Sequence, residues 1–293
     1  MWFLLSLSSA FIYSLRSLLE KWSLKKVNPY ILAFCVRFFA LPLFILPFIF
    51  GIAKLPVLTE VSPNFWMAVI LVSFIMTPVE MIFFYKALKM EEVSYVVPLL
   101  GLSPLMTAFF GSIFFGEYPS LIGLLGMTVI VFALYLLNAQ KNQSSLLDPI
   151  KYLLNNKSFK YIMLMMLSYS LGIVVDKLAI NSTDIYFYSL VNYGLVSLSL
   201  FLIAMFKAKK NFIEIKQNLL PFSIIGLVVA VYTWLRFLAL ERGNTGYVSA
   251  VLSSSVFFST IFGAMIFKEK NILKKFLIGL LILVGLVIIK IFG

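Results

Sequence analysis

The sequence predicts an all-α integral membrane protein of ten transmembrane helices, arranged as two inverted repeats of five helices. Three observations lead to this fold class. The residues are 62% hydrophobic and only 12% charged, whereas soluble domains are about 45–50% apolar and about 25% charged. Ten apolar stretches are long enough to cross a bilayer, and the two halves of the chain resemble each other.

Each predicted span contains about 20 mostly apolar residues, because ~30 Å of hydrocarbon is crossed at ~1.5 Å per helical residue. The first five spans are 2–22, 30–52, 65–88, 93–115 and 120–138. The second five are 159–180, 183–206, 219–240, 247–267 and 273–292. These runs are apolar on every side and lack the alternation of a membrane β-barrel, so helices are expected.

The longest polar stretch, residues 139–158, is predicted to link a first repeat over 1–138 to a second over 159–293. Within this linker, Asp148 followed by Pro149 is typical of a helix start. An Asp side chain caps the first turn, and proline is favoured at the first helical position because its missing N–H would have no partner there. We therefore expect a short interfacial helix there.

An internal repeat relates the two halves. A shift of 152 residues superposes 85–117 on 237–269 with ten identities, among them Ala87 with Ala239, Tyr95 with Tyr247, Gly111 with Gly263 and Glu117 with Glu269. A shift of 156 aligns Glu20 with Asp176. Because five spans is an odd number, the second repeat must enter the membrane from the opposite face, a construction typical of secondary transporters. A duplicated membrane anchor without transport is the alternative.

The repeated segments also resemble a known family. The stretches YKALKMEEVSYVVPLLGLSPLMTAFFGSIFFGE and FLALERGNTGYVSAVLSSSVFFSTIFGAMIFKE share an Ala-Leu pair, a short loop, a span rich in small residues and a terminal Glu. They are similar to the ends of the two EamA domains of the drug/metabolite transporter superfamily. The resemblance implies ten helices around a central cavity and alternating access without ATP. Substrates in that family include amino acids, other metabolites, sugar conjugates and drugs.

Charged residues inside the spans are candidates for function, because a charge near the bilayer centre costs about 2.5–3.5 kcal/mol on insertion scales. The first half carries Arg16, Glu20, Arg37 and Glu80 at similar depth, toward the side on which the first helix ends. We expect these four to form one network. A static set of ion pairs and a gate or substrate clamp both remain open as its role.

The second half carries Asp176 and Arg236, which lie toward the opposite face and are expected to pair there. The adjacent Lys177 is expected to extend its ammonium group to the lipid headgroups. The two charged groups would then act as gates on opposite sides.

Uncharged polar groups within the spans are further candidates for a cavity lining. Thr77 and Pro78 predict a kink near Glu80, and Pro98, Gly101, Ser103 and Pro104 interrupt the fourth span. The ninth span is rich in serine, which favours a cavity wall, with close helix packing through small residues as the alternative. The candidate lining residues are Tyr13, Tyr169, Asn192, Tyr193, Trp234 and Ser253.

The function that these features favour is secondary transport, by export or exchange, of a small polar or amphipathic metabolite such as an amino acid. A lipid flippase on the same fold is the alternative. A membrane-embedded enzyme is disfavoured, because the sequence has no histidine, one cysteine and no paired intramembrane aspartates. No cofactor, metal or nucleic acid is expected. Glu80 is a candidate proton carrier, with exchange and facilitated diffusion as alternatives, and we expect a monomer or dimer in a prokaryotic inner membrane.

The flanking charges predict an orientation. Lysines and arginines outside the span interiors divide 17 against 4 between the two sides. The positive-inside rule then places both termini outside the cytoplasm. The family resemblance implies the reverse, and we favour the charge count.

Overall fold

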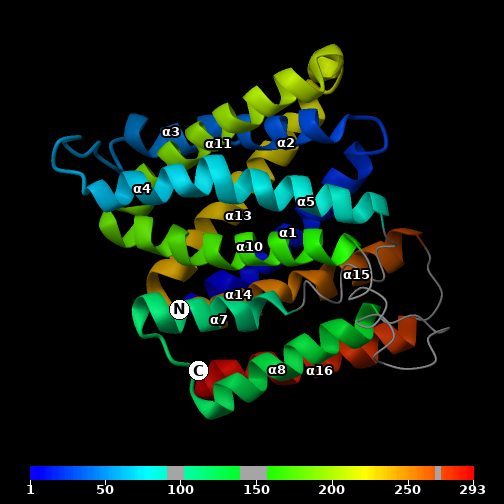
Figure 1. Ribbon diagram of the computed structural model, residues 1–293. Coiled ribbons are helices and arrows are strands. Elements are labelled where there is room, and N and C mark those ends of the chain that lie inside the picture. Colours follow the sequence, from blue (N-terminus) through cyan, green and yellow to red (C-terminus); the bar gives the residue numbers. More distant parts are fainter. Residues whose placement is uncertain (91–101, 139–156, 268–271) are drawn as a thin grey trace. The chain divides into compact units, whose positions relative to one another are not determined.

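The computed structural model describes residues 1–90, 102–138, 157–267 and 272–293, and every regular element in these ranges is a helix (Figure 1). The chain forms two compact units. The first unit contains Met1–Pro78 and Val175–Arg242, and the second contains Val79–Val174 and Gly243–Gly293. Each unit therefore combines segments from both halves of the sequence.

The first unit is a bundle of long helices. Its elements are α1 (Trp2–Ser23), α2 (Pro29–Phe38), α3 (Leu41–Ile49), α4 (Pro63–Leu71), the π-helix η1 (Val72–Met76), the end of α10 (Lys157–Ser182), α11 (Ile185–Lys207), η2 (Lys209–Phe212), α12 (Ile213–Gln217) and α13 (Leu219–Arg242). Helix α1 packs along α13, and α2 packs along α11.

The helix starts in this unit follow from local sequence. Asn28 accepts a hydrogen bond from the Tyr30 N–H at 3.0 Å, and Pro29 begins α2. Asp184 accepts from the N–H groups of Tyr186 and Phe187, at 2.8 and 2.9 Å. Such caps satisfy N–H groups that have no partner within the helix.

Two predicted spans are interrupted at prolines. Helices α2 and α3 are separated at Phe39 and Ala40, because Pro42 has no N–H for a helical bond. The five residues before Thr77 and Pro78 form the π-helix η1, and α5 (Thr77–Met90) follows. A proline ring causes such a local change of helical register by clashing with the carbonyl four residues earlier, while the predicted kink of the helix axis stays a prediction.

Six segments are long and apolar enough to cross a membrane, by length and composition. They are Trp2–Glu20, Pro29–Ile49, Pro63–Phe83, Phe159–Ser182, Ile185–Lys207 and Leu219–Arg242. Shorter apolar helices cover Ser103–Phe115, Leu121–Leu136 and Leu277–Phe292. These lengths and compositions are those of an integral membrane protein, while the count of ten spans stays a prediction.

The second unit contains the described helices that the repeated segments form, together with part of α10. They are α5, α7 (Ser103–Phe115), α8 (Leu121–Asn138), the first part of α10, α14 (Thr245–Ser253), α15 (Ser255–Phe267) and α16 (Ile272–Phe292). The predicted span 247–267 is divided at Ser254, whose hydroxyl donates to the Val251 carbonyl at 2.6 Å. A hydrogen bond from a serine hydroxyl to a nearby backbone carbonyl competes with the backbone hydrogen bonds of the helix.

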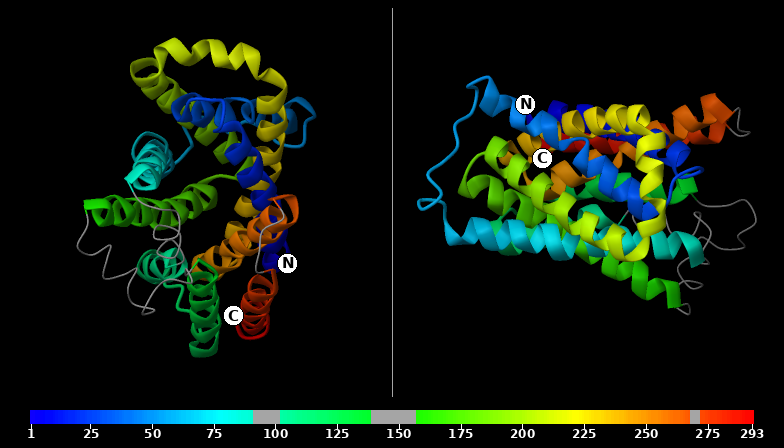
Figure 2. Two further views of the ribbon diagram at one scale, coloured as in Figure 1. Left: turned by 90° about the vertical axis from the view of Figure 1, so that its right-hand side faces the viewer. Right: turned by 90° about the horizontal axis from the view of Figure 1, so that it is seen from above.

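Helices at equivalent positions of the repeat pack together in this unit. Helices α8 and α16 lie side by side (Figures 1 and 2). A Cβ atom added at Gly285 would lie 2.8 Å from the carbonyl oxygen of Gly126, so only glycine permits this approach. Helix α7 packs on α14 in the same way. This pairing agrees with the repeat, and the inverted relation of the halves stays a prediction.

The residues shared by the two repeats make specific contacts. Glu117 accepts hydrogen bonds from the N–H and hydroxyl of Thr245, at 2.7 and 2.9 Å, at the first residue of α14. The Tyr247 hydroxyl accepts from the N–H of Ser120 at 2.8 Å, just before α8 begins. Each contact ties a helix start to the opposite half of the sequence. Pro98, Gly101, Asp148, Pro149 and Glu269 lie outside the described residues.

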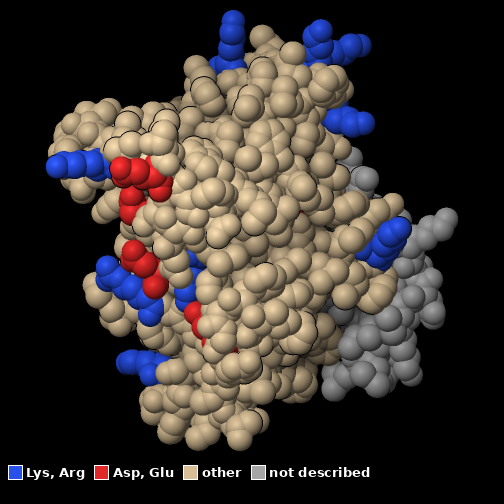
Figure 3. Space-filling model, turned by 60° about the vertical axis from the view of Figure 1, so that its left-hand side comes forward, with Lys and Arg blue, Asp and Glu red and all other residues tan. Residues whose placement is uncertain are grey.

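Lysines gather at one end of the first unit. The segment after α1 meets the segment after α11, where the Asn28 N–H donates to Glu214 at 2.7 Å. This end carries Lys25, Lys26, Lys207, Lys209, Lys210 and Lys216. The face drawn in Figure 3 is mostly uncharged, with Lys and Arg near its edges.

Replacing Glu117 with Ala should destabilise the protein, because the N–H and hydroxyl of Thr245 lose their charged acceptor. A hydrogen bond to a charged group contributes about 1.5–3 kcal/mol. Thermal unfolding in detergent should show a lower Tm for Glu117→Ala than for Glu241→Ala, since Glu241 makes only an exposed contact with Arg242 at 3.5 Å. Equal Tm values would contradict the capping role.

Cysteine labelling tests the orientation. In a Cys35→Ser background, Gly293→Cys should react with a membrane-impermeant maleimide added to intact cells, and Lys210→Cys should react only after lysis. This follows if the lysine-rich end faces the cytoplasm. The opposite labelling pattern would show that the orientation implied by the family resemblance is correct.

Candidate functional site

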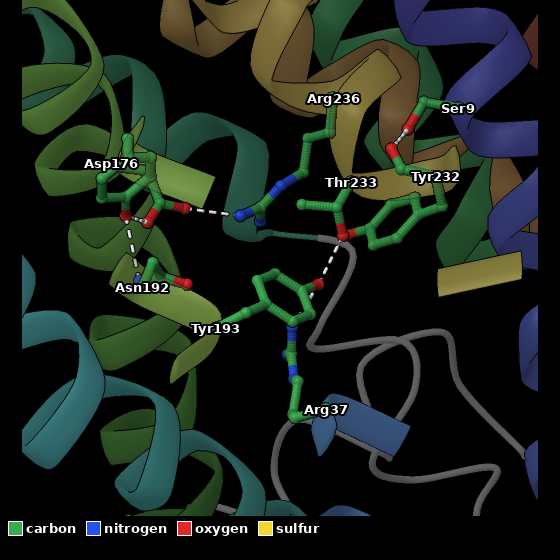
Figure 4. Close-up of polar contacts among 9 residues, drawn as sticks. Ser9, Arg37, Asp176, Asn192, Tyr193, Tyr232, Thr233 and Arg236 are labelled. Carbon is green, nitrogen blue, oxygen red and sulfur yellow. Dashed lines mark hydrogen bonds and ion pairs between the residues drawn. The ribbon is translucent and has the colours of Figure 1, made fainter. Parts of the chain in front are cut away.

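The first unit holds a polar cluster inside its candidate spans. Its centre is Asp176 on α10, which is 4% exposed. Arg236 on α13 donates from Nη2 to the Asp176 Oδ2 at 2.6 Å (Figure 4). The Tyr188 hydroxyl on α11 donates to the other carboxylate oxygen, and the Asn192 amide donates to that hydroxyl at 3.2 Å. The predicted pairing of Asp176 with Arg236 is therefore confirmed.

A second group of contacts surrounds Arg37 on α2. Its Nη1 donates to the Tyr193 hydroxyl at 2.7 Å, and its guanidinium carbon lies 5.0 Å from the centre of the Tyr193 ring. The hydroxyls of Tyr193 and Thr233 also share a hydrogen bond (Figure 4). The side chain of Tyr193 thus joins α2, α11 and α13.

A third group lies along α1. Arg16 donates from Nε to Glu20 at 2.7 Å, as expected for opposite charges four residues apart on a helix. The Arg16 guanidinium lies 5.2 Å from the ring centre of Tyr13 and 5.6 Å from that of Tyr232. The two tyrosine rings are 5.0 Å apart. Ser9 fixes α1 against α13 through a 3.0 Å bond to the Tyr232 carbonyl.

Tyr232 connects the first and third groups. Its ring centre is 5.6 Å from the Arg16 guanidinium carbon and 5.9 Å from that of Arg236. The two charged groups that were expected to be separate are therefore joined through one aromatic ring, while their placement toward opposite membrane faces stays a prediction. Although Arg16 and Arg236 lie at different heights on antiparallel helices, their long side chains extend toward the same ring.

Predicted site residues divide between the two units. Those in the first unit are Tyr13, Arg16, Glu20, Arg37, Asp176, Asn192, Tyr193, Trp234 and Arg236, and those in the second are Glu80, Tyr169 and Ser253. Glu80 and Tyr169 are half-buried. The Ser253 hydroxyl donates within its own helix, to the Ser249 carbonyl at 3.0 Å.

Three residues of the cluster were not among the predicted site residues, namely Tyr188, Tyr232 and Thr233. Tyr188 precedes Asn192 by four residues and Tyr232 precedes Arg236 by four, so helical spacing would have placed each on a face already singled out. Lys177 is 6% exposed, and the expectation that it extends to the headgroups is wrong.

The cluster can bind polar groups inside a membrane. It presents carboxylate, guanidinium, hydroxyl and amide groups from five helices within otherwise apolar spans. Such groups are expensive to bury and are retained where they pair with each other or serve a pathway. Among the described residues, no group of three or more acidic, Cys or His side chains could hold a metal ion.

Comparisons with known proteins identify the family of the chain. A model of the EamA-like transporter family matches residues 1–139 and 157–291. A solved structure titled "Crystal structure of protein" is similar with a TM-score of 0.77 and 13% identity, covering 99% of this chain and 96% of its own. That likeness concerns the fold alone. No curated protein matches the chain. The chain belongs to the EamA-like transporter family and is a membrane transporter of the drug/metabolite transporter superfamily.

Proposed function

We propose that the protein is a secondary transporter that exports or exchanges a small polar or amphipathic metabolite, such as an amino acid or a related compound. The observation that carries this proposal is the buried polar cluster of the first unit. Asp176, Arg236, Arg16 and Glu20 place two ion pairs within candidate spans. A polar solute crossing the bilayer needs partners of this kind, because the hydrocarbon offers none.

Alternating access is the mechanism that we propose. A carrier must close toward each side in turn, and its two closed states must have similar free energies. The ion pair of Asp176 with Arg236 joins α10 to α13, while that of Arg16 with Glu20 lies within α1. The pair between helices can open when the helices separate. We therefore propose it as part of a gate.

The proposal extends to proton coupling, membrane location and oligomeric state. Glu80 is a half-buried carboxyl on α5, and we propose it as the proton-carrying group if the substrate moves against its gradient. We propose a prokaryotic inner membrane as the location and a monomer as the working form, with a dimer as the alternative.

Proteoliposomes test transport and coupling together. Vesicles that contain the protein should take up a labelled substrate from a panel of amino acids and related metabolites, faster than empty vesicles. If protons drive the carrier, a pH gradient should cause accumulation, and Glu80→Gln should lose this accumulation while it keeps exchange. Absence of uptake for the whole panel, with transfer of labelled phospholipid between leaflets instead, would favour a flippase.

Arg236→Ala should lower the stability of the first unit and shift the conformational equilibrium, while the protein stays folded. A partly buried pair worth ~1–3 kcal/mol corresponds to a change of about 5–150-fold in the ratio of the two states. The measurement is the labelling rate of Ser17→Cys, a half-buried position beside Arg16, in a Cys35→Ser background.

The matched control is Arg242→Ala, which removes an arginine from the exposed end of the same helix. The control should leave both the labelling rate and transport unchanged. If Arg236→Ala behaves like the control, the pair is a static contact and the gate assignment is wrong.

A further inference from the structure

Arg37 differs from the other arginines of the polar cluster. Arg16 pairs with Glu20 and Arg236 with Asp176, at 2.7 and 2.6 Å. Among the residues that the structure describes, no carboxylate lies within ion-pair distance of Arg37, and its one hydrogen-bond partner is the neutral Tyr193 hydroxyl. Arg37 is therefore a cation without an ion pair among the described residues, in the middle of a candidate span. The carboxylate that acts on it electrostatically is Asp176, which is already paired with Arg236.

Two buried donors near Tyr193 also have no acceptor. Within the described part of the chain, the Nε of Arg37 and the indole Nε1 of Trp234 are buried without a hydrogen-bond partner. Unsatisfied buried donors cost free energy and are rare in native proteins. Both groups donate only, since guanidinium and indole have no acceptor. Together they favour a ligand that supplies acceptor oxygens.

The balance of charged side chains in the cluster also favours an anionic ligand. The polar cluster of the first unit contains the cations Arg16, Arg37 and Arg236 and the carboxylates Glu20 and Asp176. Three cations against two anions leave one positive charge. A bound molecule with one negative charge would balance it, whereas a cation would increase the imbalance.

The surroundings of Arg37 are aromatic. Phe44 packs on Tyr193 with a ring separation of 4.4 Å and against Trp234 at 5.3 Å. Phe44 and Tyr193 are buried, while Arg37 and Trp234 remain partly exposed. The side chains of Arg37 and Trp234 are thus the partly exposed members of an aromatic wall, although the Arg37 Nε and the Trp234 Nε1 are themselves buried. Such a wall suits a ligand with an apolar body.

We propose that Arg37, together with Trp234, whose ring packs on the same Phe44 as Tyr193 does, binds the carboxylate of a small organic anion that has an apolar body. This assignment rests on the proposed transport function and names its substrate class. The planar guanidinium matches a carboxylate in geometry as well as charge. Arg37 then selects for charge, while Tyr193 and Phe44 hold the guanidinium and the indole in position.

Binding can be measured at Trp234 itself. The chain has four tryptophans, and replacing Trp2, Trp22 and Trp66 with Phe leaves Trp234 as the fluorescent reporter. The probes are phenylacetate and its uncharged isostere phenylacetamide, with phenethylamine as the cation. We expect phenylacetate to change the emission of the full-length protein in detergent, with an affinity at least about tenfold higher than that of either other probe.

Variants of Arg37 identify the group responsible. Arg37→Gln should weaken phenylacetate binding at least about tenfold, and Arg37→Lys should restore part of it by keeping the charge. Arg242→Gln removes an arginine from the exposed end of α13 and should bind as the parent does. If Arg37→Gln does not fold, the comparison of phenylacetate with phenylacetamide in the parent decides the question alone.

Equal affinity for phenylacetate and phenylacetamide would overturn the proposal, and so would unchanged binding in Arg37→Gln. Fluorescence does not depend on transport, so the two proposals can fail separately. Vesicles that transport only cations or uncharged solutes would overturn the anion assignment and leave secondary transport standing. Binding of phenylacetate without any transport in vesicles would overturn the transport function and leave the anion site standing.

Discussion

The first unit depends on one buried ion pair, between Asp176 and Arg236. Removing one partner of a buried pair leaves an uncompensated charge and typically costs about 3–5 kcal/mol. Asp176 satisfies its carboxylate with Arg236 from α13 and Tyr188 from α11, so three helices are held at one point. Because separating those helices would break the contact, the same pair that stabilises the unit can also limit its opening.

The second unit depends on contacts between the halves of the sequence. Glu117 accepts two hydrogen bonds at the start of α14, and Tyr247 accepts one from Ser120 before α8. Both residues recur in the repeat. The repeated sequence therefore includes residues that fix helix starts through hydrogen bonds, in addition to the pattern of apolar residues. Gly126 and Gly285 then let α8 and α16 approach closely. The unit is therefore held together by polar contacts at the starts of α14 and α8 and by the glycine interface between α8 and α16.

Much of this structure could be predicted from the sequence, because the membrane restricts the choices. Apolar length and scarce charge predict helices, and the opposite charges of Asp176 and Arg236 predict their contact. Hydropathy could not show that α10 contributes to both units or that Lys177 turns inward, since both depend on which helices become neighbours. Helical spacing places Tyr188 on the face of Asn192 and Tyr232 on the face of Arg236. Whether a tyrosine on such a face contacts lipid, the core or the site depends on which helices become its neighbours.

A double-mutant cycle on Asp176 and Arg236 tests most directly whether this pair organises the first unit. Asp176→Asn, Arg236→Gln and the double variant would be unfolded reversibly in mixed detergent micelles, and their free energies of unfolding compared with the parent. If the pair is a cooperative contact, each single variant should be destabilised and the double should recover a coupling energy of about 1–3 kcal/mol. Single effects that add to within about 0.5 kcal/mol would show that the two side chains act independently.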